Sequence, residues 1–310
     1  MKFGLIRFIF LSRLVKMLVL EKFSVQSECY NMTKEQWYFI NTGTNDAAYN
    51  MAFDECLLRW HSEGKIPPVL RFYTWTPAAM SVGYFQKVEG KIHTENIKHH
   101  GFDFVRRLTG GRAVLHDHEL TYSVVVSEDH PEMPKTVTEA YRVITKGLLE
   151  GYRNLGIDAD MAVPEGKLQQ TGSAVCFDEP SWYELVIGGK KAAGSAQTRK
   201  QGVILQHGSV PISMDDDVLF DLFAFPNEKV RDRSKEKFKE KATSMEEYLG
   251  RELSLEEVED AFYQGFEKGL DIELVPFELT DEQKQEVKML AKEKYESDEW
   301  NFSLSKKGVK

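Results

Sequence analysis

The chain has 310 residues, of which 42% are hydrophobic, 12% are aromatic and only 10 are prolines. A chain of this composition buries a large core, which excludes a disordered or low-complexity protein. Its 40 basic and 49 acidic residues leave a net charge of −9, which argues against a general nucleic-acid-coating protein.

Cysteine usage and the N-terminal stretch both bear on cellular location. Cys29, Cys56 and Cys176 are too few and too scattered for a disulfide framework, and no CxxC pair suggests zinc, so a reducing, cytoplasmic location is expected. Residues 3–20 are apolar but contain three cations, so no run approaches the ~18 uncharged residues of a spanning helix. No signal-peptide cleavage site follows, although a basic amphipathic surface helix stays possible. Met32 heads a natural-looking start, so residues 1–31 are predicted to be an extension before a single catalytic domain of residues 32–310.

The elements predicted in chain order begin with a helix at 45–64, which Asn45 or Asp46 caps and Gly64 ends. Short apolar runs between glycine and proline breakers then predict strands at 69–73, 80–84, 104–107, 113–115 and 120–126. A helix at 138–155 follows, and further strands are predicted at 159–163, 183–187, 191–198 and 203–209.

The last third of the chain is more charged. It predicts helices at 255–269 and 280–295 around a strand at 273–277, and a solvated charge run at 231–242. The whole order predicts an α+β fold with a mixed, largely antiparallel sheet flanked by helices. Its core is expected at about 64–275, with a C-terminal helical part at 276–310.

Common catalytic motifs are missing. The sequence contains no GxxxxGK[ST] loop, no GxGxxG after a strand, no GxSxG elbow and no HExxH helix. The pairs at 99–100 and 116/118 are histidines, but adjacent strand residues point to opposite faces and do not easily share one ion. No metal site is therefore predicted.

The segment RRLTGGRAVLHD, residues 106–117 and here named the clamp segment, lies between two predicted strands. Gly110 and Gly111 allow positive φ and a close approach of substrate to the main chain. Three arginines, Arg106, Arg107 and Arg112, lie on either side of the glycines. In an acidic protein this concentration of positive charge suggests that an anionic ligand binds here. A tight hairpin with surface arginines is the alternative, and the segment alone does not decide between them.

The segment YELVIGGKKAAGSAQ, residues 183–197, predicts two strands joined by a Gly-Gly turn. On the second strand Lys191, Ala193, Ser195 and Gln197 share a face by the two-residue repeat, so Lys191 looks along a wall of small side chains. This wall favours a slot for an extended ligand, because a structural strand usually prefers β-branched residues. Close sheet packing is the alternative.

Cys176 lies in the segment SAVCFDEPSWYE, 15 positions before Lys191 (191 − 176). If the chain doubles back, the Lys191 ammonium would stabilise the Cys176 thiolate and make it a nucleophile. An inert buried thiol is the commoner state of a cysteine. Cys56, in mid-helix among apolar neighbours, is predicted to be such a core residue.

Several ordered segments together resemble the superfamily of lipoate-protein ligases, octanoyltransferases and biotin ligases. The likeness is closest to the LipM type of bacterial octanoyl-[acyl carrier protein]:protein N-octanoyltransferases. The matching segments, between residues 37 and 301, are NMAFDE, MSVGYFQ, RRLTGGRAVLHDHELTYS, SAVCFDEPSWYE, GGKKAAGSAQTRKQGVILQHGS and KYESDEWN. Arg112 occupies the position of the last glycine in the SGGG motif of the ligases, and its bulk and charge disfavour the binding of an adenylate. Residues 1–31 match nothing in the family.

The resemblance implies the lipoate/biotin-ligase catalytic-domain fold and acyl transfer without metal, nucleotide or other cofactor. An octanoyl group would pass from the thioester of acyl carrier protein to an enzyme cysteine, and then to a lysine of a lipoyl-domain protein, typically the glycine cleavage H protein. The family cysteine falls on Cys176, and the lysine of its G-x-K element falls on Lys191, which is expected to lower the thiol pKa. The positions matching the substrate-binding clamp and pocket strands are Arg107, Thr109, Gly110, Gly111, His116, Ser195, Ala196, His207 and Gly208.

A local group of cations is expected to attract the acidic carrier protein. This predicted basic rim consists of Arg106, Arg107, Arg112, Lys190, Arg199 and Lys200. Three alternatives stay open: an ATP-dependent lipoate-protein ligase, an amidotransferase that moves octanoyl groups between lipoyl domains, and a non-enzymatic acyl- or lipoyl-protein binding module.

Overall fold

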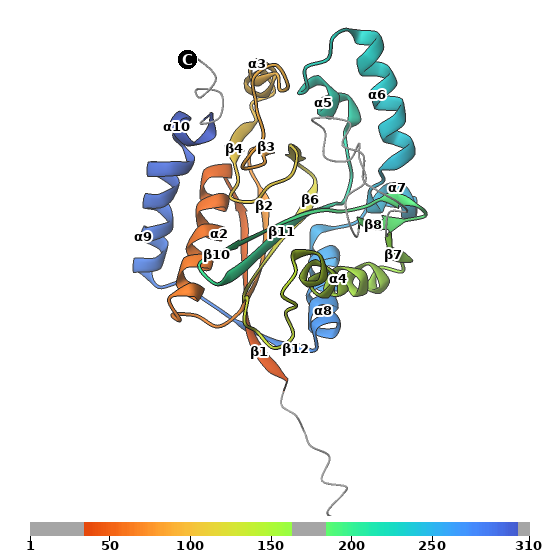
Figure 1. Cartoon of the computed structure of the whole chain (residues 1–310). Helices are drawn as coiled ribbons and strands as arrows, with labels where there is room; N and C mark the ends of the chain where they lie inside the picture. Colours follow the sequence, from red (N-terminus) through yellow and green to blue (C-terminus); the bar gives the residue numbers. More distant parts are fainter. Residues whose placement is uncertain (1–33, 163–183, 303–310) are drawn as a thin grey trace, which may run out of the picture. The chain divides into compact units, whose positions relative to one another are not determined.

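The computed structural model of the chain describes residues 34–162 and 184–302 (Figure 1). By internal contacts the chain divides into Met1–Glu35 and Gln36–Lys310, and the fold below is that of the second unit. The proposed extension at 1–31 and the nucleophile candidate Cys176 lie outside the described residues. None of the helices in the described segments is long and apolar enough to cross a membrane.

A six-stranded sheet in the order β10-β11-β6-β2-β1-β12 forms the centre of this unit. Its strands are β1 (Glu35–Asn45), β2 (Val69–Trp75), β6 (Glu119–Ser127), β10 (Gly194–Lys200), β11 (Val203–Pro211) and β12 (Ile272–Pro276). The neighbouring strands β2 and β6, β6 and β11, and β11 and β10 pair antiparallel, whereas β1 pairs parallel with β2. The predicted mixed, largely antiparallel sheet is confirmed, and β1 is a strand that the sequence analysis missed.

Two smaller sheets extend the central one. The first contains β4 (Asp103–Arg106), β3 (Ala79–Val82) and β5 (Val114–His116), and so includes both ends of the clamp segment. The second contains β7 (Ala159–Ala162), β8 (Glu184–Ile187) and β9 (Lys190–Lys191). The clamp is therefore anchored on a sheet of its own, next to the main sheet.

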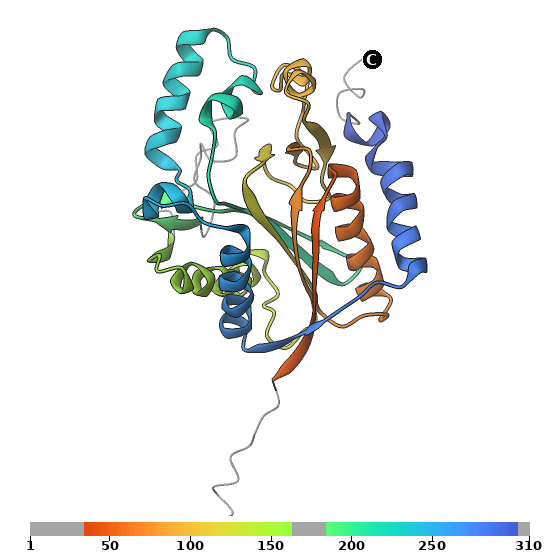
Figure 2. The ribbon, with the colours of Figure 1, turned by 180° about the vertical axis from the view of Figure 1, so that it is seen from behind.

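Helices cover both faces of the central sheet (Figures 1 and 2). On one side lie α2 (Ala47–Ser62) and α9 (Asp281–Leu290), which continues into a π-helical turn, η1 (Ala291–Tyr295). On the other side lie α4 (Val137–Asn154) and α8 (Leu255–Leu270). The remaining helices are α3 (Thr94–His99), α5 (Asp216–Asp221), α6 (Glu228–Lys241), α7 (Met245–Leu249) and α10 (Asp298–Asn301).

Alternation along the strands separates the two cores. On β2, Leu70 and Phe72 pack into the core with α4 and α8, whereas Val69 and Tyr73 pack into the core with α2. This is the two-residue period expected of a sheet covered on both faces. The predicted charge run lies on α6, which buries only Phe238, so its interpretation as a solvated face is confirmed.

The predicted strand at 191–198 is wrong as one continuous element. Lys191 ends β9, which pairs with β8, whereas β10 begins at Gly194 in the six-stranded sheet. Between them the backbone N–H of Ala192 donates to the carbonyl of Leu185, and the Ala192 carbonyl accepts from the Tyr152 hydroxyl at 2.9 Å. These two bonds hold the chain where it leaves one sheet for the other, so Lys191 does not share a strand face with Ser195.

Candidate active site

A cavity lies where the clamp segment meets β10 and β11. Most of the predicted substrate-binding residues line it: Arg107, Gly111, His116, Ser195, Ala196, His207 and Gly208. The structure therefore brings together residues from two segments that lie about a hundred positions apart in the chain.

The two remaining predicted clamp residues lie behind this lining. Thr109 is fully buried, and its Oγ1 lies 2.7 Å from His207 Nε2. The carbonyl of Gly110 accepts a 2.8 Å hydrogen bond from Arg107 Nη2. Both residues therefore support the side chains that line the cavity.

Glycines allow the walls of the cavity to approach one another. A Cβ at Gly208 would lie 2.5 Å from Ser195 Oγ, and a Cβ at Gly83 would lie 2.0 Å from the carbonyl oxygen of Gly111. Gly111 has φ +94°, as predicted, but Gly110 is not among the residues with positive φ, so only one of the two clamp glycines needs that freedom.

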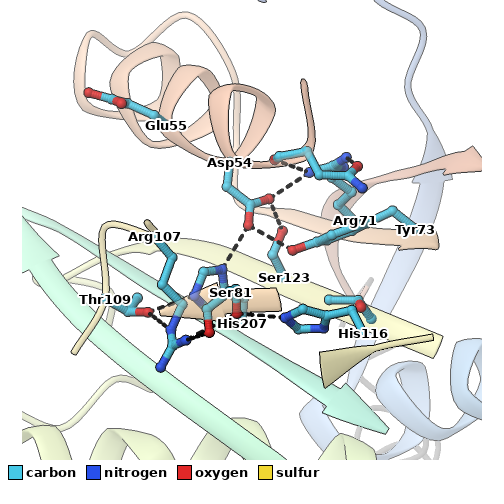
Figure 3. A network of polar contacts seen from close by, with 12 residues as sticks. Asp54, Glu55, Arg71, Tyr73, Ser81, Arg107, Thr109, His116, Ser123 and His207 are labelled. Atoms are coloured by element: carbon cyan, nitrogen blue, oxygen red, sulfur yellow. Dashed lines mark hydrogen bonds and ion pairs between the residues drawn. The ribbon is translucent and has the colours of Figure 1, made fainter. Parts of the chain in front are cut away.

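Arg107 connects the clamp to two histidines of the cavity (Figure 3). Its Nε donates to Thr109 Oγ1 at 3.2 Å and its Nη1 donates to Ser81 Oγ at 3.1 Å. Its Nη2 donates to the carbonyls of Gly110 and Arg112. Because the guanidinium is planar, these contacts fix the clamp backbone and both hydroxyls relative to one another.

The first histidine, His207, lies between Thr109 and Asp54. Its Nδ1 is 2.8 Å from Asp54 Oδ2. Burial lowers the pKa of His207 below its usual value, although Asp54 opposes the shift. The imidazole is therefore neutral near pH 7, with Nδ1–H donating to the carboxylate and Nε2 accepting from the Thr109 hydroxyl.

Asp54 projects from α2 into the sheet, whereas its neighbour Glu55 points away (Figure 3). Arg71, Ser123 and His207 are register partners on β2, β6 and β11, and all three donate to the Asp54 carboxylate. Burial by itself raises the pKa of Asp54, but Arg71 and His207 together lower it below its usual value. The buried carboxylate is thus ionised, and its charge is balanced by the Arg71 guanidinium 2.8 Å away.

The second histidine, His116, lies between Ser81 and Glu119. Its Nε2 is 2.7 Å from Ser81 Oγ, and its Nδ1 is 2.7 Å from Glu119 Oε1. The indole of Trp75 stacks on the imidazole with ring centroids 4.1 Å apart. Glu119 also accepts hydrogen bonds from the hydroxyls of Thr121 and Ser209, so this buried carboxylate has three donors.

Lys191 is buried at the end of β9, where its carbonyl accepts from the Thr243 N–H at 3.0 Å. Within residues 34–162 and 184–302, Lys191 is not one of the residues that line the cavity. The pairing of Lys191 with Cys176 stays a prediction, because Cys176 lies outside the described segments.

The prediction of a basic rim is wrong for Arg106 and Arg107, because both side chains are buried. Arg106 is fully buried, and its Nη1 donates to the carbonyls of Gly83, Tyr84 and Gln86, while Arg107 is 5% exposed. These guanidinium groups satisfy backbone carbonyls within the fold, so neither is available to a partner protein.

The outer members of the rim differ in their contacts. Arg199 bonds the carbonyls of Pro134, Lys135 and Thr136, and Lys190 lies 3.3 Å from Glu247. Lys200 is exposed.

Cys56 is a buried thiol, as predicted. Burial raises its pKa to about 12, so it stays protonated and unreactive near neutral pH. Across the described residues there is no group of three or more histidine, cysteine or carboxylate side chains placed to hold a metal ion.

The sequence analysis did not identify four polar residues that organise the site: Asp54, Arg71, Ser81 and Glu119. Three of them lie in segments that carry the family resemblance, namely NMAFDE, MSVGYFQ and the clamp with its following strand. The sequence did offer one signal, because each of these charged or hydroxyl side chains lies inside an otherwise apolar element. Their hydrogen-bond partners lie on other elements, so the sequence did not show what each side chain contacts.

Comparison with known proteins assigns the chain to a family. The model of the lipoyl protein ligase A/B catalytic domain matches residues 46–267. Curated LipM octanoyltransferases of Geobacillus kaustophilus and Bacillus subtilis are 60% and 56% identical to it over 276 residues, which cover 87% of this chain and 99% of each relative. The chain belongs to the LipM octanoyltransferase family. The predicted family and acyltransferase class are therefore confirmed.

Solved structures similar to this LipM-family chain include lipoate-protein ligases. The bipartite ligase of Thermoplasma acidophilum has a TM-score of 0.71 and 27% identity, covering 88% of this chain and 97% of that one. A lipoate-protein ligase A solved with bound ATP has a TM-score of 0.69 and 26% identity, covering 88% and 99%. The predicted ligase-like catalytic fold is confirmed.

Proposed function

We propose that this LipM-family enzyme transfers an octanoyl group from octanoyl-acyl carrier protein to a lysine of a lipoyl-domain protein, through a thioester on Cys176. The observation that carries the proposal is the cavity lined by the clamp residues Arg107, Gly111 and His116 together with six residues of β10 and β11. The identity of more than half the residues with LipM octanoyltransferases supports the octanoyl group as the acyl substrate.

The first half-reaction is an exchange of thioesters. The Lys191 ammonium stabilises the Cys176 thiolate, whose sulfur attacks the carbonyl carbon of the donor thioester. Backbone N–H groups near the glycine-rich turn before Lys191 receive the developing oxyanion. The donor C–S bond breaks, its electron pair leaves with the pantetheine sulfur, and that sulfur takes a proton from solvent.

The second half-reaction forms an amide. Because a thioester remains on the enzyme, the acyl group stays activated and no nucleotide is needed for the lysine to attack. The apolar part of the cavity, including Met51, Trp75 and Val114, keeps water away from the thioester.

The proposed partners follow from the two half-reactions. The donor is an acidic acyl carrier protein, with Lys200, Arg112 and Lys190 as the remaining surface cations of the rim. The acceptor is a lipoyl-domain protein such as the glycine cleavage H protein. A free thiolate nucleophile requires a reducing compartment, so we also propose a cytoplasmic location.

A nucleotide-free transfer assay tests this function. Purified enzyme, octanoyl-acyl carrier protein and apo H protein should give octanoylated H protein without ATP, and Cys176→Ala and Cys176→Ser should abolish the transfer. Cys56→Ser serves as the matched cysteine control and should retain activity, because its thiol is buried on α2 with a pKa raised to about 12.

Three results would contradict the proposal. Full activity of Cys176→Ala would remove the covalent step. A strict need for ATP with free octanoate would instead indicate a ligase, the activity named for the structurally similar proteins. Transfer only from octanoylated H protein would indicate an amidotransferase, and binding of octanoate without any turnover would indicate a binding module.

A further inference from the structure

The second half-reaction of the proposed function requires a proton acceptor. The ε-amine of an acceptor lysine has an ordinary pKa of about 10.4, so it arrives as an ammonium ion at neutral pH. An ammonium ion has no lone pair with which to attack a thioester. Some group in the cavity must take a proton from it before the amide bond forms.

Ser81, His116 and Glu119 have the geometry of a proton relay. Ser81 and His116 both line the cavity, and the Ser81 Oγ to His116 Nε2 distance is 2.7 Å. Behind the imidazole, His116 Nδ1 lies 2.7 Å from the buried Glu119 carboxylate. A hydroxyl, an imidazole and an orienting carboxylate in this order make a positioned base.

The hydrogen bonds of Ser81 leave room for a substrate. A serine hydroxyl has one O–H donor and two acceptor lone pairs. With His116 Nε2 as the acceptor, the Ser81 O–H donates to it, and one lone pair accepts from Arg107 Nη1 at 3.1 Å. The second lone pair is the one that an incoming ammonium N–H can use.

Glu119 fixes the direction of this relay. Because a carboxylate oxygen can only accept, the hydrogen bond to Glu119 is made by His116 Nδ1–H, and in that neutral tautomer Nε2 accepts from the Ser81 hydroxyl. The Trp75 ring stacked at 4.1 Å keeps the imidazole in this plane. When His116 gains a proton, the Glu119 carboxylate stabilises the imidazolium.

The other basic groups near the cavity are less suited to this task. Both nitrogens of His207 are engaged, by Asp54 and by the fully buried Thr109. Lys191 does not line the cavity within the described part of the chain, and the proposed function already assigns its positive charge to the thiolate.

We propose that the Ser81–His116–Glu119 relay removes the proton from the acceptor lysine, an inference that rests on the proposed function and identifies the base of its second half-reaction. The ammonium N–H passes its proton to Ser81 Oγ as the Ser81 proton moves to His116 Nε2. The nitrogen lone pair then attacks the thioester carbon. The C–S bond breaks with its electron pair on the Cys176 sulfur, which takes the second proton that the nitrogen loses, and His116 returns its proton to solvent.

A half-reaction experiment separates this role from a structural one. The enzyme is first acylated with octanoyl-acyl carrier protein, the donor is removed, and discharge is followed by intact-mass spectrometry with either apo H protein or hydroxylamine. Hydroxylamine is largely unprotonated at neutral pH and needs no base. The variants are Ser81→Ala and Glu119→Gln, with Ser127→Ala at the far end of β6 as the matched control.

In both variants we expect discharge by H protein to fall about 100-fold relative to discharge by hydroxylamine, the lower range for general acid–base catalysis. In Ser127→Ala the ratio of these two discharge rates should stay at that of the parent. If Glu119→Gln does not fold, Ser81→Ala, which removes a single oxygen atom, decides the question.

Discharge of acylated Ser81→Ala by H protein at the parent rate would overturn the relay. An equal loss of the discharge rate with H protein and with hydroxylamine would also overturn it, because that result indicates a misplaced thioester. Failure of the parent enzyme to acylate Cys176 would be seen before any variant is made, and it would overturn the proposed function itself. A last outcome concerns the Cys176→Ala variant. If this variant releases octanoate, and the double variant Cys176→Ala/Ser81→Ala does not, then Ser81 acts as a nucleophile, which would also overturn the relay.

Discussion

At the scale of single residues, Arg107 organises the site. Its three nitrogens donate to Thr109, to Ser81 and to two clamp carbonyls, and through the two hydroxyls they reach His207 and His116. Each histidine in turn faces a buried carboxylate. One guanidinium thus sets the orientation of both imidazoles, which a lysine at this position would not do, because its point charge lacks the planar arrangement of donors.

Lys191 carries the first residue-scale prediction. Lys191→Ala removes the positive charge proposed to stabilise the Cys176 thiolate, so the pKa of that thiol should rise. The rate of alkylation by iodoacetamide, measured against pH, should therefore shift to higher pH. Lys190→Ala, which removes the adjacent charge beside Glu247, is the control and should leave the profile in place. An unchanged profile in Lys191→Ala would contradict the proposed role.

Sequence alone predicted many of these residues but not their connections. The sequence analysis places Arg106 and Arg107 in a basic rim that attracts an acidic partner, because a sequence does not show which backbone carbonyls will lack a partner. In the fold the carbonyls of Gly83, Tyr84 and Gln86 converge on Arg106. Asp54 was missed for a similar reason: its function depends on three strands whose register places Arg71, Ser123 and His207 side by side.

At the scale of elements, the helix pair α4 and α8 supports the strands that form the cavity. Their backbones approach at glycines, since a Cβ at Gly265 would lie 2.3 Å from the Gly151 nitrogen and one at Gly269 would lie 2.6 Å from the Gly147 nitrogen. From α4, Tyr152 reaches the Ala192 carbonyl just before β10. The spacing of these helices therefore sets the path of the chain from Lys191 to the cavity.

Gly265→Ala tests this close packing. Alanine favours a helix by about 1 kcal/mol over glycine, but here the added methyl group meets backbone atoms that cannot move independently. We expect a net loss of about 1–3 kcal/mol in the free energy of unfolding by urea, as for overpacked cores. Gln264→Ala, an exposed neighbour on α8, should change stability by less than about 0.5 kcal/mol. Equal stability of Gly265→Ala and the parent would contradict the packing argument.

The C-terminal elements also act on the clamp. Asn301 in α10 accepts from the backbone N–H of Arg106 at 2.8 Å, and Trp300 Nε1 donates to the Arg106 carbonyl at 2.8 Å. The sequence analysis placed KYESDEWN among the family segments, but spacing did not show that it contacts the clamp 195 positions earlier.

Most predicted helices and strands are observed, because their hydrophobic periodicity is strong. The misses have physical causes. The segment 191–198 has the composition of one strand, but Ala192 and Ala193 are small enough to be buried where the chain changes sheets, so the strand is interrupted there. The helices α5, α6 and α7 lie in charged sequence, in which α6 buries only Phe238 and gives little periodic signal.

At the scale of the whole unit, the buried Asp54–His207 pair makes stability depend on pH. The pKa of His207 is lowered from 6.5 in the fold, chiefly by burial, so below about pH 6.5 the unfolded chain binds a proton that the folded chain does not. Acidification through this window therefore favours unfolding. The pKa of Asp54 is lowered from 3.8, so its stabilising contribution is lost as the pH falls further, below about 4.

Thermal unfolding between pH 7.5 and 5 measures this dependence. We expect the midpoint of the parent to fall as the pH drops below about 6.5. His207→Gln should start lower and lose less over the same range, since it has no imidazole to titrate. A parent midpoint that rises on acidification, or a variant with the same slope as the parent, would contradict the assignment of a neutral buried His207.

The central claim is that the octanoyl group rests on Cys176 between donor and acceptor, and intact-mass spectrometry with peptide mapping measures this directly. Enzyme mixed with octanoyl-acyl carrier protein and no nucleotide should gain the mass of one octanoyl group on the peptide containing Cys176, and apo H protein should remove it while gaining the same mass. Transfer that proceeds without any acylated enzyme, or an adduct that forms only when ATP is added, would contradict the account.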